Sequence, residues 1–357
     1  MKGVKKMKFR KVPVSLVKIV LVTLLCIVSL PYATTAADYK PAVASHRGAS
    51  GYLPEHTLEA KTMAYAMGVD YIEQDVVFTK DNVLVVLHDH TLETTTDVEK
   101  KFPDRHREDG SYYAIDFTLS EIKSLLVTER FDPKTGKAVF AGRFPKGFDI
   151  DFRVPTLEEE IILIQGLNKS TGRNVGLYVE VKEPAFHEKE GKLIMEATIE
   201  LLSKYGYNKK DAPVILQIFD FDAVKKSRAL GWQAALAMLV DMDGQMLIDD
   251  KDVHKWLLTE EGVKEVSKFA SIYAPWFSHL AVPSEDGNSW TTAPCLKWAR
   301  DAGMLVHTWT HRTDSLAKGF ATKKAMFDAI FKEMKLDGLF SDFPDHPIEY
   351  LNKNGLR

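Results

Sequence analysis

The fold is decided by an alternation that is clearest in residues 214–240, VILQIFDFDAVKKSRALGWQAALAMLV. A short apolar run at Val214–Phe219 precedes a segment with helical spacing, Asp222–Leu230, and a second apolar run follows at Ala234–Val240. Apolar runs of this length, separated by a helical segment, are typical of parallel strands joined by a crossover helix. The stretch therefore predicts one strand–helix–strand unit of an α/β fold.

The same alternation extends along the chain in both directions. Nine strands are predicted, at Val43–His46, Tyr71–Val77, Val83–Leu87, Leu177–Val181, Val214–Phe219, Ala234–Val240, Ser271–Pro275, Leu305–Trp309 and Gly338–Ser341. Helices are predicted between most of them, at Thr57–Met67, Leu157–Leu167, Lys192–Lys204, Asp222–Leu230, Glu261–Phe269, Pro294–Ala302 and Lys324–Met334. This pattern predicts a parallel sheet covered by helices.

One pair of strands differs from the rest, because only residues 78–82 separate Tyr71–Val77 from Val83–Leu87. So short a connection makes an antiparallel hairpin. If the hairpin turns about Lys80-Asp81, paired residue numbers sum to 161 and His88 lies opposite Glu73. The remaining eight strands predict a (β/α)8 TIM barrel, and such a barrel takes about 250 residues.

Residues 89–155 are rich in charge, Gly and Pro and are predicted to be a small insertion after the second strand. The alternative fold is an open doubly wound sheet. Such a sheet commonly carries a Gly-rich phosphate-binding loop after its first strand, and this sequence has none there.

Composition narrows the class of protein. The chain of 357 residues is 45% hydrophobic and 27% charged, which is ordinary for a globular protein. Its formal charge is −3, but the first 37 residues carry seven Lys/Arg and no Asp or Glu. The remainder has a net charge of −10, from 40 basic and 50 acidic side chains. Since such a surface repels a polyanion, no nucleic-acid partner is expected.

The N-terminal stretch predicts export. A basic segment ends at Lys18, an apolar run of 12 residues covers Ile19–Leu30, and small residues follow up to Ala37. Twelve helical residues span about 18 Å, less than a bilayer core of about 30 Å. Residues 1–37 are thus predicted to be a cleaved signal peptide, with a retained anchor as the alternative, and residues 38–357 to be the mature domain, with no membrane span. We expect the periplasm, or otherwise secretion or the cell surface; the sequence does not fix the oligomeric state.

Charged residues stand where the predicted strands end, which is the face of a barrel that carries active sites. The pairs Glu73 and Asp75, and Glu180 and Lys182, are each two apart in a strand, so each pair shares one face. Three carboxylates at one barrel mouth repel each other unless a cation lies among them, and oxygen ligands suit Ca²⁺ or Mg²⁺. The structural alternatives are a solvated carboxylate face and an ion pair between Lys182 and Glu180.

Several segments match a known family: HRGASGYLPEHT (46–57), EQD (73–75), HDH (88–90), DFTL (116–119), EVK (180–182) and GLFSDFP (338–344). These segments resemble the glycerophosphodiester phosphodiesterases, in particular the exported bacterial branch. The resemblance implies a barrel with an insertion. It also implies one divalent cation, Ca²⁺ before Mg²⁺, held by Glu73, Asp75 and Glu180, and a general acid/base pair of His46 and His88.

The activity that the resemblance implies is hydrolysis of deacylated phospholipids to glycerol 3-phosphate and an alcohol. Arg47 and Lys182 would neutralise charge on the phosphate, and Gln217, Phe219 and Trp309, at strand ends, are candidates to contact the glycerol. Three other functions stay open: a phospholipase D-like enzyme acting on intact lipids, a metal-dependent amide or ester hydrolase, and a surface binding protein with a vestigial site.

Overall fold

The computed structural model describes residues 39–241 and 251–357, and the chain from Lys40 to Arg357 forms one compact unit. The predicted signal peptide, residues 1–37, lies outside the described residues. Within the described ranges, no helix combines the length and the apolar character needed to cross a membrane.

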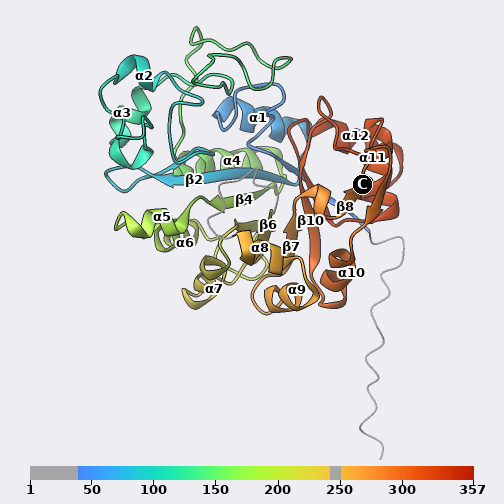
Figure 1. The fold of residues 1–357 in the computed structure, drawn as a ribbon. Coiled ribbons are helices and arrows are strands. Elements are labelled where there is room, and N and C mark those ends of the chain that lie inside the picture. The colour runs from blue at the N-terminus through green and yellow to red at the C-terminus, as the bar shows by residue number, and fades with distance from the viewer. Residues whose placement is uncertain (1–38, 242–250) are drawn as a thin grey trace, which may run out of the picture. The chain divides into compact units, whose positions relative to one another are not determined.

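Eight parallel strands close into a barrel (Figure 1), so the TIM-barrel prediction is confirmed. In order around the barrel they are β1 (Ala42–Ser45), β2 (Tyr71–Phe78), β4 (Gly176–Val181), β5 (Val214–Ile218), β6 (Ala235–Val240), β7 (Ile272–Pro275), β10 (Leu305–His311) and β11 (Gly338–Ser341). Closure comes from β1, which pairs with β11 along its length and with β2 at Ala44↔Tyr71 and Ser45↔Ile72.

Helices lie between the strands in sequence and surround the barrel in space (Figure 1). They are α1 (Leu58–Met67), α4 (Leu157–Thr171), α5 (Pro184–Lys189), α6 (Ile194–Lys204), α7 (Phe221–Ala229), α8 (Lys251–Leu257), α9 (Glu260–Val266), α10 (Pro294–Asp301), α11 (Lys323–Asp328), which continues into a π-helical turn at Ala329–Glu333, and α12 (Asp345–Lys353). Side chains at i, i+3 and i+4 on these helices pack against the outer face of the sheet.

Strand periodicity decides which side chains enter the barrel. On β4, Leu177 and Val179 belong to the outer core under the helices, whereas Tyr178 belongs to a separate interior cluster with Ile215 and Phe340. Because the side-chain period is two, Glu180 shares the inward face with Tyr178. The inward carboxylate therefore sits above the interior aromatic layer.

The predicted hairpin is present, but its predicted register is wrong. The strand β3 (Leu84–Val86) pairs with β2 at Val76↔Val86 and Phe78↔Leu84, so paired numbers sum to 162 rather than 161. The cause is a three-residue loop, residues 80–82, which ends at Asn82 with a φ of +62°. His88 consequently lies beyond the paired part of β3 and not opposite Glu73.

Residues 89–155 build a small unit beside this hairpin. It contains α2 (Val98–Lys101), a 3₁₀ turn at Ala114–Asp116 and α3 (Leu119–Ser124), which lie together on the β2 side of the barrel in Figure 1. Their apolar side chains, among them Phe117 and Ile122, form a hydrophobic cluster of their own on Val77 and Val85 of the hairpin. A second, short hairpin, β8 (Ala281–Pro283) with β9 (Trp290–Thr292), was not anticipated by the strand pattern.

Candidate active site

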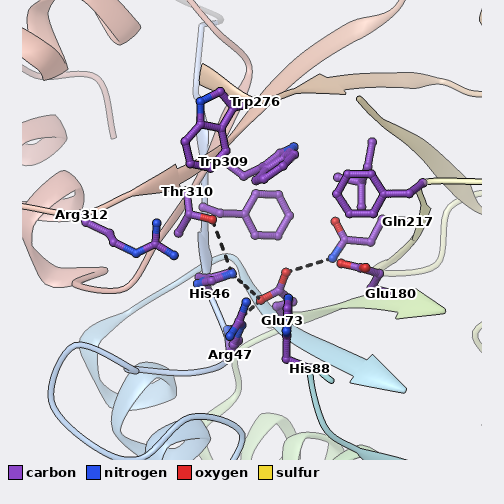
Figure 2. A pocket seen from close by; sticks show the side chains of 13 residues that line it. His46, Arg47, Glu73, His88, Glu180, Gln217, Trp276, Trp309, Thr310 and Arg312 are labelled. Carbon is purple, nitrogen blue, oxygen red and sulfur yellow. Dashed lines mark hydrogen bonds and ion pairs between the residues drawn. The ribbon is translucent and has the colours of Figure 1, made fainter. Parts of the chain in front are cut away.

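A pocket of about 120 Å³ opens among the carboxyl ends of the barrel strands (Figure 2). Its lining contains eight of the ten predicted site residues, His46, Arg47, Glu73, His88, Glu180, Gln217, Phe219 and Trp309, together with Leu239, Trp276, Thr310, Arg312 and Phe340. The other two, Asp75 and Lys182, are buried and do not line the pocket.

The loop after β1 places two of these residues. His46 follows the strand directly, and its N–H donates to the carbonyl of Ser341 on β11 at 3.0 Å. The chain then turns through positive φ at Arg47 (+56°) and Gly48 (+88°). A Cβ on Gly48 would come within 2.8 Å of the Ala60 carbonyl carbon, so this turn against α1 requires glycine. The turn directs the Arg47 N–H to Glu73 Oε2 at 2.7 Å.

His46 is oriented by an aspartate from the far end of the chain. Its Nδ1 lies 2.6 Å from Asp342 Oδ1, and its Nε2 lies 3.9 Å from Glu73 Oε2. Burial, followed by the Arg47 charge, lowers the pKa of His46 to about 4, while Asp342 acts in the opposite direction. Burial alone would raise the pKa of Asp342, but Arg312 and His46 hold it well below its usual range. An ionised Asp342 keeps the proton on Nδ1 and leaves Nε2 facing the pocket.

His88 has the same arrangement with its sequence neighbour. Its Nδ1 lies 2.5 Å from Asp89 Oδ1. Burial, then the charges of Arg47 and Lys182, lower the pKa of His88 to about 3. The site thus holds two His–Asp pairs, each of which fixes an imidazole at Nδ1; the other nitrogen of His46 lies 3.4 Å from Thr310 Oγ1 (Figure 2), within reach of the pocket for proton transfer.

Three buried carboxylates converge beside the histidines. Glu73 and Asp75 stand on β2, Glu180 stands on β4 in register with Asp75, and one oxygen from each lies within 4.8 Å of the others. Burial, then repulsion from Asp75 and Glu180, raises the pKa of Glu73 well above its usual range. Burial likewise raises the pKa of Glu180 to about 8, although Lys182 opposes this. In both groups burial is the largest cause, and repulsion between the carboxylates adds to it.

Asp75 differs from the other two carboxylates because a histidine supports it. Burial would raise its pKa, but His56, whose Nε2 lies 2.7 Å from Asp75 Oδ2, holds that pKa well below its usual range. His56 Nδ1 in turn lies 3.1 Å from Lys61 Nζ, which pairs with Glu160 Oε2 at 3.2 Å in the fully buried layer behind the site.

The donor set fits a hard divalent cation. Asp75 Oδ1 and Gln217 Oε1 are buried and have no hydrogen-bond partner within residues 39–241 and 251–357. Gln217 Nε2 donates to Glu73 Oε1 at 3.0 Å, so the Gln217 amide stands beside the triad. Carboxylate and amide oxygens are the ligands that Ca²⁺ and Mg²⁺ prefer. The buried acidic triad can therefore bind a metal ion.

Both predicted basic residues are paired within the protein. Arg47 Nη1 donates to Glu55 Oε1 at 3.0 Å, and Arg47 Nε lies 3.7 Å from Asp75 Oδ2. Lys182 Nζ donates to Glu180 Oε1 at 2.6 Å, which is the ion pair considered above as its structural alternative. Arg47 reaches the pocket surface, whereas Lys182 acts from behind Glu180.

Aromatic side chains form the opposite wall of the pocket (Figure 2). The ring centroids of Phe219 and Trp309 lie 5.4 Å apart, and those of Trp309 and Trp276 lie 5.0 Å apart, both edge-to-face. Trp309 Nε1 donates to the carbonyl of Ala274 at 2.9 Å, which fixes the indole. The pocket therefore suits a ligand that has polar groups on one side, for the charged wall, and apolar carbon atoms on the other, for the aromatic wall.

Sequence reasoning missed the residues that support the site. Asp89 could have been found, because it adjoins His88. Asp342 stands 296 positions from His46, so only barrel closure reveals the pair. The others are His56 in the loop between β1 and α1, Arg130 and Arg143 in residues 89–155, and Trp276 and Arg312 at strand ends.

Comparison with known proteins agrees with this geometry. Residues 46–346 match the model of the glycerophosphoryl diester phosphodiesterase family. A Haemophilus influenzae protein named glycerophosphodiester phosphodiesterase is 42% identical over 325 residues, covering 87% of this chain and 89% of that protein. A Treponema pallidum protein of the same name is 35% identical over 332 residues, covering 87% and 92%.

Solved structures share the fold. One from Silicibacter pomeroyi superposes with a TM-score of 0.65 at 22% identity, covering 89% of this chain and 95% of that one. An Oleispira antarctica phosphodiesterase, solved in complex with the product sn-glycerol-3-phosphate, gives 0.57 at 20% identity, covering 88% and 98%. The family match over most of the chain, together with relatives above 30% identity, settles the classification: the chain belongs to the glycerophosphoryl diester phosphodiesterase family, and the protein is an enzyme of that family.

Proposed function

We propose that this phosphodiesterase hydrolyses glycerophosphodiesters to glycerol 3-phosphate and an alcohol with one divalent cation, Ca²⁺ in preference to Mg²⁺, and two histidines. The observation that carries the proposal is the pocket in which two His–Asp pairs, His46–Asp342 and His88–Asp89, flank the acidic triad. The names of the relatives and the product held by the Oleispira antarctica enzyme support the substrate class.

Glu73, Asp75 and Glu180 would hold the cation. When bound, it would supply positive charge for the phosphate oxygens, on which negative charge grows in the transition state. Three carboxylates with a nearby amide oxygen, Gln217 Oε1, favour Ca²⁺, which accepts more ligands and a less regular geometry than Mg²⁺.

His46 and His88 carry the proton transfers through their Nε2 atoms, since each Nδ1 is engaged by an aspartate. One imidazole takes the proton of the attacking hydroxyl as its oxygen bonds to phosphorus. The other gives a proton to the leaving alcohol oxygen as the old phosphorus–oxygen bond breaks. Each such transfer contributes about 10²–10⁴ in rate. A phosphodiester anion in the pocket raises the low pKa values of both imidazoles. It thereby favours the state that the reaction needs, in which one of the two imidazoles is protonated.

Arg47, which reaches the pocket surface, binds the phosphate directly. Lys182, held against Glu180, adds positive potential from behind. Phe219 and Trp309 contact the glycerol carbons from the opposite side, and Gln217, beside Glu73, contacts a glycerol hydroxyl. Export to the periplasm, or beyond it, remains our proposal from the composition of residues 1–37.

The test is release of glycerol 3-phosphate from glycerophosphocholine by the protein from residue 38 onward. We expect EDTA to abolish release, Ca²⁺ to restore it better than Mg²⁺, and Glu73→Ala to remain inactive with either ion. The matched control is Glu349→Gln, which changes an exposed glutamate of α12 and keeps full activity. Intact phosphatidylcholine is assayed in parallel.

Two results contradict the proposal. Release that persists in EDTA, or in Glu73→Ala, removes the metal site from the mechanism. Cleavage of the intact lipid with no cleavage of the deacylated one transfers the activity to the phospholipase D-like alternative.

A further inference from the structure

Two arginines of the segment 89–155 hold the second oxygen of each aspartate that orients a histidine. Arg130 Nη1 donates to Asp89 Oδ2 at 2.7 Å, and Arg143 Nη2 lies 2.7 Å from Asp342 Oδ2, which also accepts from Arg312 Nε at 2.8 Å. In both aspartates the other oxygen, Oδ1, receives the imidazole Nδ1. His46–Asp342 joins two distant parts of the chain and His88–Asp89 joins two neighbours, yet arginines of the same segment contact both aspartates.

Each arginine is fixed at its other edge. Arg130 donates two hydrogen bonds to Glu55, from Nε to Oε2 at 2.9 Å and from Nη2 to Oε1 at 2.7 Å. Arg143 Nε donates to Asp314 Oδ2 at 2.9 Å, and its guanidinium lies 3.8 Å from the ring centroid of Phe140. The Arg143 side chain is only 3% exposed. A surface ion pair contributes little, but guanidinium groups held this way are rigid, directional donors.

These contacts act on the histidines through the aspartates. Arginine stays protonated throughout the working pH range, so it helps to keep its aspartate ionised, at Asp342 together with Arg312. It also fixes the plane of the carboxylate, because one oxygen is bound on the side away from the imidazole. An ionised, fixed carboxylate keeps the Nδ1–H tautomer and aims Nε2 into the pocket.

Resting on the function proposed above, we propose that segment 89–155 positions both histidines, with Arg143 and Arg130 as positioning residues that act through Asp342 and Asp89. Arg130 also influences Arg47, because both arginines contact Glu55: Arg47 Nη1 donates to the two Glu55 oxygens at 3.0 Å and 3.1 Å. Removal of Arg130 therefore disturbs phosphate binding as well. Arg143 has no contact with Arg47 among the described hydrogen bonds and gives the cleaner test.

The experiment is a double-mutant cycle on Arg143 and Asp342 in the Ca²⁺-loaded protein. We expect Arg143→Gln to lower kcat by about 10–100-fold with little change in KM, the size typical of groups that orient functional side chains. Arg143→Lys restores part of kcat, because it returns the charge without the planar fork. Asp342→Asn lowers kcat further, and adding Arg143→Gln to it causes no additional loss, because Arg143 acts through that carboxylate.

Arg105→Gln is the matched control. Arg105 belongs to the same segment, donates to Glu121 Oε1 at 2.9 Å and lies 4.6 Å from the ring centroid of Phe117, but it contacts neither histidine-bound aspartate. We expect full kcat from this variant. Thermal unfolding and Ca²⁺ binding are measured on every variant to confirm the fold.

The outcomes separate this inference from the proposed function. If Asp342→Asn keeps full kcat, the role of His46 in the proposed function is overturned, and this inference with it. If Asp342→Asn is impaired while Arg143→Gln is normal, or if the two losses simply multiply, only the positioning role is overturned. An equal loss in Arg105→Gln also overturns it, since the effect is then general to the segment.

Discussion

Glu129 is the residue whose charge state departs most from expectation in the segment 89–155. Its side chain is buried, and Oε2 has no hydrogen-bond partner among the described residues. Burial, then repulsion from Glu55, raises the pKa of Glu129 to about 8. Asp342 adds to the repulsion, whereas Arg143 and Arg130 reduce it. The native state therefore favours the protonated acid at neutral pH.

The sign of the pH dependence follows from this raised pKa. In the unfolded chain Glu129 ionises near the usual pKa of about 4.3, so its favourable contribution is complete below that pH and is lost as the pH rises to about 8. The variant Glu129→Gln has no carboxyl group to ionise, so its stability does not fall with pH in this way. We expect the stability of the variant relative to the native protein to grow between pH 5 and 8, by at most about 1.4 kcal/mol per pH unit.

Urea unfolding at pH 5, 6.5 and 8 measures this difference. Glu99→Gln, at an exposed glutamate of α2, is the control and should show no trend. A constant difference between Glu129→Gln and the native protein at all three pH values would mean that Glu129 is ionised in the folded state.

At this scale the sequence predicts groups that one element presents and misses groups that two distant elements bring together. Glu73 and Asp75 follow from period-two spacing on a single strand. The His46–Asp342 and Arg143–Asp342 contacts span 296 and 199 positions, and no local pattern marks them. Arg143 lies in a polar loop, so the sequence alone predicts a solvated side chain there. Only the fold shows that it is buried.

Among the elements, the loop between β1 and α1 depends on close packing against the chain after β11. A Cβ on Gly51 would lie 2.4–2.6 Å from ring atoms of Phe343, and the Gly51 N–H donates to the carbonyl of Asp342 at 2.8 Å. Phe343 is confined by Tyr52, whose ring centroid lies 5.1 Å away at 85°. The ring has little room to yield.

Gly51→Ala is therefore expected to destabilise the protein by about 1–3 kcal/mol, the usual cost of overpacking, and to lower kcat because Asp342 moves with Phe343. Gly166→Ala is the matched control: Gly166 lies on the exposed face of α4, and an added Cβ there meets no described atom within 4 Å. That variant should gain up to about 1 kcal/mol from helix propensity. Urea unfolding and kcat are measured for both, and an unchanged Gly51→Ala protein contradicts the packing argument.

Elements were predicted best where their hydrophobic pattern is regular. The eight barrel strands agree with the sequence within one or two residues, because buried parallel strands are short continuous apolar runs. The register of the hairpin failed by one residue, because residues 80–82 form a three-residue loop that ends with Asn82 in the left-handed region. β8 and β9 were missed because three residues carry no periodicity.

The molecule as a whole assembles the site, since the acidic triad requires β2 and β4 to pair in register at Asp75↔Glu180. Global unfolding separates these strands and leaves carboxylates with no common geometry. A cation that binds only the folded triad must then stabilise the entire barrel by mass action. The identity of that cation, unlike the fold, is not encoded in any hydrophobic pattern.

We expect Ca²⁺ at 100 times its dissociation constant to raise the free energy of unfolding by about 2.7 kcal/mol, seen as a rise of a few degrees in Tm for a domain of this size. Glu180→Gln removes one carboxylate from the triad, so it should lose most of this rise. Without Ca²⁺ the same variant should be at least as stable as the native protein, because burial and the charge of Asp75 disfavour the Glu180 carboxylate more than its ion pair with Lys182 favours it. Glu285→Gln, at an exposed loop position, should keep the full Ca²⁺ effect. An equal rise in Tm for Glu180→Gln and Glu285→Gln would place the stabilising ion elsewhere and leave the triad without its proposed role.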